Sequence, residues 1–393
     1  MSKIEELIAK YCPDGVEYVK LGDVCEVLTG GEAPDNSIKG KEPQGDCIYP
    51  IYSNGIGENA LWGFAPTYRI NTRSITFSSI GTTGYPTLRD CCYTPIIRLK
   101  VIYPKDDLIL NVCFLKYALE IVEFEKQKSS VPNINASMIK SIEIPLPPLP
   151  IQEEIVRILD TFTELQAELQ AELQARQQQY QYYRDNLLSF EGRTDVEWKK
   201  LGEVGEIIRG NGLQKKDFTE IGVGCIHYGQ IYTKYGAFTD KTLTFVDKEL
   251  ATHLLQVEKG NLVIACTSEN VEDICKSVAW LGDDNICIGG HSCVFKHDQN
   301  PKYIAYFFQT ECFSKQKKKY VYGTKVMDIK PSDIAKIEVP LPTLEEQQKI
   351  VDILDRFDTL VNDLSQGLPA EIEARRQQYE YYRDKLLTFK RKA

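Results

Sequence analysis

The sequence predicts a mixed α/β protein of the α+β type, in which two tandem globular domains are separated by long helices that pair as an antiparallel coiled coil. Repetition within the chain carries this prediction. The motif Gln-Gln-Tyr-x-Tyr-Tyr-Arg-Asp-x-Leu-Leu occurs at residues 178–188 and again at 377–387. A proline-rich hinge, Ile-Glu-Ile-Pro-Leu-Pro at 142–147, returns as Ile-Glu-Val-Pro-Leu-Pro at 337–342. The chain is therefore a tandem duplication, and its domain-sized period excludes a solenoid.

A third pair of similar segments marks where the copies begin, at Val16 and at Val196. The predicted parts are a first globular domain at 1–149, a central helical region at 150–190, a second globular domain at 191–343 and a C-terminal helical region at 344–393. A single long amphipathic helix would leave its apolar stripe in water. We therefore expect the two helical regions to bury their stripes against each other.

Both globular domains have short apolar runs of β type, broken by glycine-rich turns. In the first domain we expect strands at 74–77 and 94–101 and a helix at 110–126. In the second domain we expect strands at 224–228, 261–266 and 286–288 and a helix at 302–316.

The central helical region has apolar residues at alternating spacings of four and three, which indicate a heptad seam. These residues are Ile151, Ile155, Ile158, Phe162, Leu165 and Leu169. The tetrapeptide Leu-Gln-Ala-Glu then occurs twice in succession from Leu165, which is expected to unwind a coiled coil locally without ending the helix. The C-terminal region carries a second expected seam at Ile350, Ile353, Phe357, Leu360 and Leu364. Pro369 is expected to stop the helix there or to kink it.

Composition is that of a folded protein, with 42% hydrophobic and 26% charged residues. No apolar run is long enough to span a bilayer, so we expect a cytoplasmic protein with no membrane partner. The 12 cysteines include no Cys-x-x-Cys pair, and free, mostly buried thiols are expected. Cys287, His291, Cys293 and His297 form a dense cluster, which alternation along a strand explains better than a metal site. We therefore predict no metal site in this chain.

The helical motifs give the chain a family resemblance. The hinges are followed by Gln-Glu-Glu-Ile-Val-Arg-Ile-Leu-Asp from Gln152 and by Glu-Gln-Gln-Lys-Ile-Val-Asp-Ile-Leu-Asp from Glu346. Together with the two Tyr-Tyr-Arg-Asp motifs and the tandem tetrapeptides, these segments resemble the specificity subunit of type I restriction-modification enzymes. The likeness covers the whole chain and specifies two target-recognition domains and two conserved helical regions.

This resemblance implies a DNA-reading subunit with no catalytic activity of its own. Each recognition domain would read one half of a bipartite target in double-stranded DNA, and the coiled coil would set the gap between the halves. The helices would dock two methyltransferase subunits, and restriction/translocase subunits would join them. No cofactor is expected on this chain, because S-adenosylmethionine, ATP and Mg would be bound by those partners. The sequence agrees, since it contains neither a phosphate-binding loop nor an Asn/Asp-Pro-Pro-Tyr/Phe methyltransferase motif.

Base reading requires polar groups on loops, with phosphate contacts beside them. The candidates in the first domain are Ser53, Asn54, Ser79, Thr82, Thr83, Tyr85, Lys128 and Ser130. Those in the second domain are Gln230, Tyr232, Lys234, Ser268, Asn270, Lys318, Tyr322, Thr324 and Lys325. The resemblance assigns subunit docking to Tyr182, Tyr183, Arg184, Tyr381, Tyr382 and Arg383.

The net charge of −9 is unusual for a DNA-binding chain, and lysine runs such as 317–319 are also typical of a solvated surface. Periodicity and composition alone would equally suit an adaptor without DNA, which presents two binding modules on a coiled coil. The whole-chain resemblance favours DNA.

Overall fold

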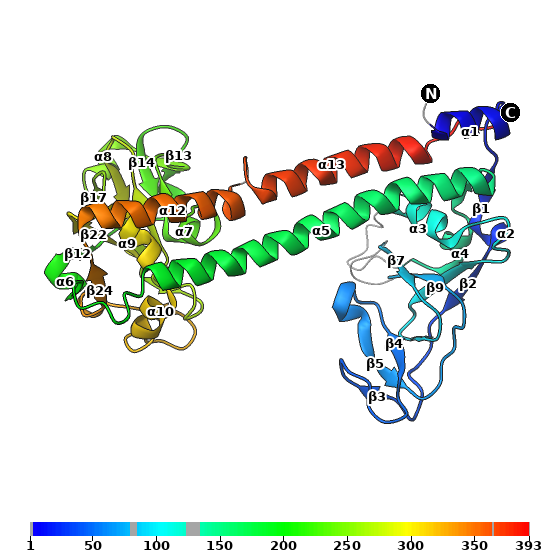
Figure 1. Ribbon diagram of the computed structural model, residues 1–393, viewed down its shortest axis with the longest axis horizontal. Coiled ribbons are helices and arrows are strands. Elements are labelled where there is room, and N and C mark those ends of the chain that lie inside the picture. The colour runs from blue at the N-terminus through cyan, green and yellow to red at the C-terminus, as the bar shows by residue number, and fades with distance from the viewer. Residues whose placement is uncertain (1–2, 79–84, 123–133, 364, 393) are drawn as a thin grey trace. The chain divides into compact units, whose positions relative to one another are not determined.

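The computed structural model describes residues 3–78, 85–122, 134–363 and 365–392. The chain divides into two compact units, one formed by 1–168 with 373–393 and the other by 169–372. Each unit contains a globular part of helices and sheets together with portions of the long helices (Figure 1). The predicted α+β class is therefore confirmed.

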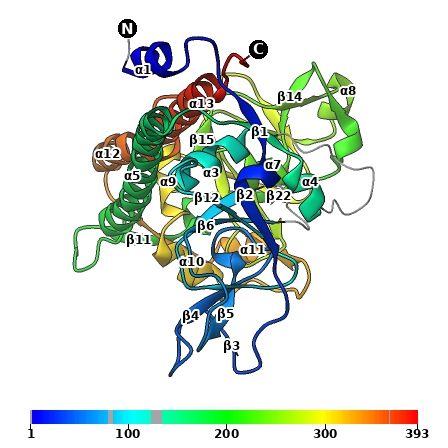
Figure 2. The same cartoon turned by 90° about the vertical axis from the view of Figure 1, so that its right-hand side faces the viewer.

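The first unit has two four-stranded sheets. The antiparallel sheet β2-β9-β6-β7 consists of Cys25–Thr29, Lys100–Pro104, Ser74–Phe77 and Pro86–Arg89. The sheet β3-β5-β4-β8 consists of Ile38–Lys39, Leu61–Ala65, Tyr49–Tyr52 and Thr94–Pro95, with β4 and β8 parallel. The largest core lies between the first sheet and the helices α1 (Lys3–Tyr11), α2 (Leu21–Val24), α3 (Val112–Glu120) and α4 (Ala136–Lys140). The two ends of the chain lie close together in this unit, where Val16 N–H donates to the Lys390 carbonyl at 2.8 Å (Figure 2).

The second unit repeats both sheets and adds one strand to each. Its first sheet, β12-β22-β18-β20-β15, consists of Gly205–Arg209, Ser292–His297, Leu262–Ala265, Ser277–Trp280 and Phe238–Thr239. Its second sheet, β13-β16-β14-β21-β17, consists of Phe218–Thr219, Thr244–Val246, Val223–Ile226, Ile286–Ile288 and Leu255–Val257. The helices of this globular part are α6 (Leu201–Val204), α7 (Tyr228–Thr233), α8 (Lys248–Ala251), α9 (Pro301–Phe307), α10 (Glu311–Lys317) and α11 (Pro331–Ile334). The strand order is that of the first unit apart from β15 and β17, so the duplication seen in the sequence is also a duplication of fold.

The repeated segments meet at the base of each domain. The start of each copy pairs antiparallel with its hinge, β1 (Tyr18–Lys20) with β10 (Glu143–Pro145) and β11 (Glu197–Lys200) with β24 (Glu338–Leu341). The same backbone bond follows in both copies, from Leu21 N–H to Ile142 at 2.8 Å and from Leu201 N–H to Ile337 at 2.9 Å. Each repeated copy therefore begins and ends at one two-stranded ribbon.

Each unit pairs two long helices that run in opposite directions. Helix α5 (Leu149–Leu187) is continuous through the tandem tetrapeptides, as predicted. It lies beside α13 (Leu368–Leu387) in the first unit, where Phe162 stacks on Tyr382. In the second unit it lies beside α12 (Leu344–Asn362), where Tyr180 stacks on Phe357. The predicted break near Pro369 is also confirmed, because α12 ends before it and α13 begins at Leu368.

The expected seam of the C-terminal region was partly wrong. Ile353 and Leu360 are exposed, whereas Val351, Leu354 and Val361 are buried. The reason is that α12 packs against α9 of its own domain, where Lys302 and Tyr306 both bond Asp355, and not only against α5. Leu364 lies outside the described residues. In α5 the expected Ile158 is half-buried while Leu159 is fully buried, because that face covers the core of the first domain.

Two further element predictions were wrong. The expected strand at 94–101 is divided into β8 and β9 by a turn in which Ile97 and Arg98 have φ values of 52° and 60°. The expected helix at 302–316 is two helices, because α9 ends at Phe307 and Thr310 caps the start of α10 by accepting a hydrogen bond from Phe313 N–H.

One buried glutamine joins each domain to its long helix, at Gln152 and at Gln347, both fully buried. Gln152 accepts from Asn111 N–H at 2.8 Å and donates to the Pro147 carbonyl at 2.7 Å. Gln347 accepts from Asn300 N–H at 3.1 Å and donates to the Pro342 carbonyl at 3.0 Å. Asn111 and Asn300 cap α3 and α9, so a single side chain holds the helix cap and the hinge together.

We expect Gln152→Leu and Gln347→Leu each to lower the free energy of unfolding by about 2–4 kcal/mol, because each leaves buried backbone groups without a hydrogen bond. Urea denaturation followed by circular dichroism measures the change. Gln170→Leu, at an exposed position on α5, is the matched control. Equal stability of the Gln152 and Gln170 variants would contradict the role of the joint.

His297 makes the stability of the second unit depend on pH. Its Nδ1 accepts from Gln299 N–H at 3.2 Å, and its buried Nε2 has no hydrogen-bond partner among the described residues. Burial lowers the pKa of His297 to about 4. Because the unfolded chain takes up a proton near pH 6.5 and the folded chain does not, stability is present above pH 6.5 and is lost as the pH falls toward 4. We expect wild type to lose on the order of 2 kcal/mol more over this range than His297→Phe, as measured by urea denaturation at each pH.

Candidate nucleic-acid interface and docking surface

Of the first-domain candidates that the structure describes, Ser53 and Asn54 follow the end of β4 and Tyr85 precedes β7. Ser53 N–H donates to the Ala60 carbonyl at 2.8 Å, which closes the turn into the 3-10 helix Gly57–Ala60. The amide of Asn54 donates to the Ile97 carbonyl, and the Asn54 carbonyl accepts from Ser78 Oγ at 3.1 Å. Tyr85 is 55% exposed. The candidates Ser79, Thr82, Thr83, Lys128 and Ser130 lie outside the described residues.

The candidates Gln230, Tyr232 and Lys234 were expected on a loop, but they lie in the helix α7 or directly after it, and the polar side chains of α7 bond within the domain. Gln230 Oε1 accepts from His227 N–H at 3.1 Å and from Thr244 Oγ1 at 3.2 Å. Tyr232 OH donates to the Thr267 carbonyl at 2.5 Å, and burial raises its pKa. Lys234 is the residue that follows the last turn of α7.

The candidates Ser268 and Asn270 stand at the end of the strand β19 (Thr267–Ser268). Ser268 is buried, while Asn270 is exposed and is engaged with Asp273 through both ends of its amide. A bidentate contact of Asn270 with adenine would therefore require exchange of these two bonds.

The lysines at the end of α10 differ in burial. Lys317 is buried and donates to the carbonyls of Glu272 and Ile274, and burial lowers its pKa. Lys318 is exposed, as are Tyr322, Thr324 and Lys325 in the loop that follows. These exposed side chains fit the predicted phosphate contacts, and Lys317 does not.

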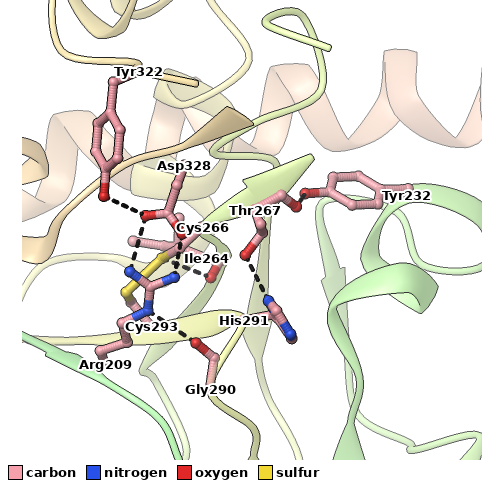
Figure 3. Close-up of a disulfide and its surroundings, with 10 residues drawn as sticks. All are labelled: Arg209, Tyr232, Ile264, Cys266, Thr267, Gly290, His291, Cys293, Tyr322 and Asp328. Atoms are coloured by element: carbon pink, nitrogen blue, oxygen red, sulfur yellow. Dashed lines mark hydrogen bonds and ion pairs between the residues drawn. A yellow bond between two sulfur atoms is a disulfide. The ribbon is translucent and has the colours of Figure 1, made fainter. Parts of the chain in front are cut away.

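The two candidate loops of the second domain meet. The strand β23 (Met327–Asp328) pairs antiparallel with β19 in a two-stranded sheet. The segment that contains Ser268 and the loop that contains Lys325 are therefore neighbours. Below them, Arg209 of β12 binds both carboxylate oxygens of Asp328, at 2.9 and 2.6 Å (Figure 3). The hydrogen bonds to Asp328 raise the pKa of Arg209 above its usual value. Sequence reasoning missed this pair, because nothing local relates two residues more than a hundred positions apart.

A disulfide lies beside this pair and joins Cys266 to Cys293 (Figure 3). The expectation of free thiols was wrong for these two cysteines, since Cys266 directly follows β18 and Cys293 lies on the neighbouring strand β22. The other ten cysteines are free, and half of them are buried. His291, from the Cys/His cluster, bonds Thr267 Oγ1 through Nδ1 at 2.9 Å. No group of three or more His, Cys, Asp or Glu side chains in the described part of the chain could hold a metal ion.

The two Tyr-Tyr-Arg-Asp motifs have the same arrangement in their respective units. The second tyrosine stacks on a phenylalanine of the paired helix at 5.4 Å, Tyr183 on Phe357 and Tyr382 on Phe162. The first tyrosines, Tyr182 and Tyr381, are 68% and 62% exposed. Arg184 and Arg383 are mostly buried and bond the aspartates that follow them. In each motif the second tyrosine therefore contacts the paired helix, and the first tyrosine is exposed and accessible to a partner.

The fold and the two sets of loops define a protein that presents two recognition domains on paired helices. The profile of a family described as "Type I restriction modification DNA specificity domain" matches residues 13–176 and 194–374. The chain belongs to this family, as the resemblance predicted, and its two tandem domains fit recognition of a two-part DNA target. No helix among the described residues combines the length and apolar character needed to cross a membrane.

Relatives of known name agree with this assignment. The chain is 33% identical to the EcoR124I/EcoR124II specificity subunit of Escherichia coli, over 99% of this chain and 97% of the relative. It is 25% identical to the MjaVIII specificity subunit of Methanocaldococcus jannaschii, over 89% and 87%. A solved chain from work on complex assembly and conformational transition of the type I R-M system has a similar fold, with a TM-score of 0.63 and 16% identity over 95% and 98% of the two chains. The S subunit from M. genitalium aligns with a TM-score of 0.54 and 16% identity over 95% and 96%.

Proposed function

We propose that this chain is the DNA-reading subunit of a type I restriction-modification enzyme and that each globular domain reads one half of a bipartite target. The observation that carries the proposal is the doubled sheet scaffold, with strand order β2-β9-β6-β7 in one unit and β12-β22-β18-β20 in the other. The polar loops that leave these scaffolds differ in sequence between the units. A constant scaffold with different loops is what two different half-sites require.

The continuous helix α5 is proposed to set the gap between the half-sites. The exposed tyrosines Tyr182 and Tyr381 are proposed to dock one methyltransferase subunit each, and restriction/translocase subunits join the assembly. The chain is proposed to be non-catalytic. S-adenosylmethionine, ATP and Mg belong to the partner subunits in this scheme.

Co-expression of the chain with its methyltransferase subunit, followed by adenine-methylation mapping of the host genome, tests the proposal. We expect a bipartite motif with a fixed gap, which disappears when this chain is omitted. Stable complex formation without any sequence-dependent methylation would argue against DNA reading. Failure to form a complex would favour an adaptor without DNA.

A further inference from the structure

The second recognition domain holds its two candidate loops with one ion pair. Tyr322 and Asp328 exchange both backbone hydrogen bonds, at 3.1 and 2.8 Å, and so close residues 323–327 into a loop. Residues 322–326 are all exposed. Gly323 has φ of 114°, and a Cβ there would lie 2.1 Å from the Val326 carbonyl, so the loop is tight. The loop therefore depends on its closing residue, Asp328.

Asp328 is held from three sides. Its carboxylate accepts one hydrogen bond from each Nη atom of Arg209, and Oδ1 also accepts a hydrogen bond from Tyr322 OH at 3.1 Å. Its backbone belongs to β23, which pairs with Thr267 and Ser268. The next residue, Ile329, donates its N–H to the Cys266 carbonyl at 3.1 Å. The Asp328 carboxylate thus joins the 323–327 loop to Arg209 of β12, while the backbone of Asp328 and Ile329 joins the same loop to the segment 266–268.

Arg209 is directed inward. Its Nε donates to the Gly290 carbonyl at 2.9 Å, so all three guanidinium nitrogens are engaged with the protein (Figure 3). Gly290 precedes His291, which bonds Thr267. The guanidinium therefore bonds both the Gly290–His291 segment, which contacts Thr267, and Asp328, which closes the 323–327 loop. Such a fork is specific to arginine, because a lysine ammonium cannot make the paired planar contact.

We propose that Arg209 and Asp328 are positioning residues of the second recognition domain, whose ion pair fixes the 323–327 loop against the Thr267–Asn270 segment so that both contact the same DNA half-site. The inference rests on the proposed function. Neither residue needs to touch a base. The pair sets the spacing of groups that do.

The variants Arg209→Lys and Asp328→Asn, each in the full chain assembled with methyltransferase subunits, test this role. Arg209→Lys keeps the charge and loses the fork, while Asp328→Asn keeps the shape and loses the charge. Lys259→Ala is the matched control, because Lys259 pairs with Asp283 at 2.6 Å in an exposed salt bridge and precedes the opposite end of β18.

Methylation mapping should show that both variants accept altered bases in one half-site only, with base preference there reduced roughly tenfold or more. The other half-site, the gap and the Lys259→Ala motif should match wild type. Unchanged selectivity in assembled variant complexes would overturn the inference. An equal loss at all sites, with selectivity kept, would make Arg209 a phosphate contact and would also overturn it. Unfolding of the second unit in both variants would show that the pair only stabilises the fold, and this result would also overturn the inference.

A second measurement separates this inference from the proposed function. Amide hydrogen exchange of residues 322–328 in the full chain should be roughly tenfold faster or more in Asp328→Asn than in wild type or Lys259→Ala, because the closing contacts are lost. Faster exchange supports the positioning contact even where wild type shows no bipartite motif, a result that would count against the proposed function alone. Unchanged exchange would overturn the inference, whatever the methylation pattern.

Discussion

Insertion of one additional Leu-Gln-Ala-Glu unit after Glu172 is expected to abolish methylation at the wild-type motif and to create a new motif with the same two half-sites and a longer gap. The unit adds four residues, which is about 6 Å of helix and therefore comparable to about two base-pair rises. Helix α5 is continuous through this tract, and the boundary between the two units falls inside it, after Glu168. An inserted turn should therefore change the spacing of the units without entering either globular core.

Methylome sequencing of a strain that carries the insertion measures both motifs. We expect occupancy of the original motif to fall roughly 100-fold or more, since a mismatch in spacing prevents both halves from binding at once. The matched control exchanges Gln170 and Glu172, which are both exposed and keep the length of the tract unchanged. An insertion variant that still methylates the original gap would refute the spacer role of α5.

Truncation of the two exposed motif tyrosines, Tyr182→Ala with Tyr381→Ala, is expected to weaken binding of the methyltransferase subunits roughly 30-fold or more at each docking site. Exposed aromatic side chains of this kind commonly dominate an interface, and loss of one costs about 2 kcal/mol or more, roughly 30-fold in affinity. Because the motifs lie in different units, each single variant should retain one partner subunit. Native mass spectrometry of the co-expressed complexes distinguishes two, one or no bound methyltransferase subunits.

The neighbouring tyrosines supply the control for this experiment. Tyr183 and Tyr382 stack on phenylalanines of the paired helices and are 39% and 36% exposed, so Tyr183→Ala should lower the free energy of unfolding by about 1 kcal/mol. Tyr182→Ala should change stability by less than about 0.5 kcal/mol, as expected for an exposed side chain. Full retention of both partner subunits by the Tyr182/Tyr381 double variant would exclude these side chains as docking residues.

Repetition made much of this fold predictable. The hinge and the Tyr-Tyr-Arg-Asp motif located the long helices. The helix break near Pro369 was predicted because proline interrupts a helix interior and is favoured in the first turn of a new helix. Strand β6 was predicted with its observed ends, because Ile75, Thr76 and Phe77 are apolar or β-branched and the segment lies between turn signals. The family assignment followed from the same repeated motifs.

Other features depended on contacts between distant residues. The buried stripe of α12 was predicted toward the paired helix alone, but α9 covers part of it, and periodicity cannot name the element that will cover a face. Gln230 and Tyr232 were expected on a loop, but the side chains of Gln230 and His227 form a capping box that begins helix α7. The Arg209–Asp328 pair and the Cys266–Cys293 disulfide join positions far apart in sequence. The DNA-contact candidates remain predictions, because their role depends on a ligand that the sequence does not contain.

The glutamine joint has a consequence for how such a protein could acquire a new target. Gln152 and Gln347 make the same bonds at the base of each domain, next to ribbons that the two copies share. The candidate DNA-contact loops of each unit lie between the two strands of one ribbon. A gene exchange that replaces the sequence from Leu21 to Ile142, or from Leu201 to Ile337, would therefore install a different domain on unchanged supports. In such a lineage, target preference could change by whole-domain substitution, with the helices and their partner contacts inherited intact.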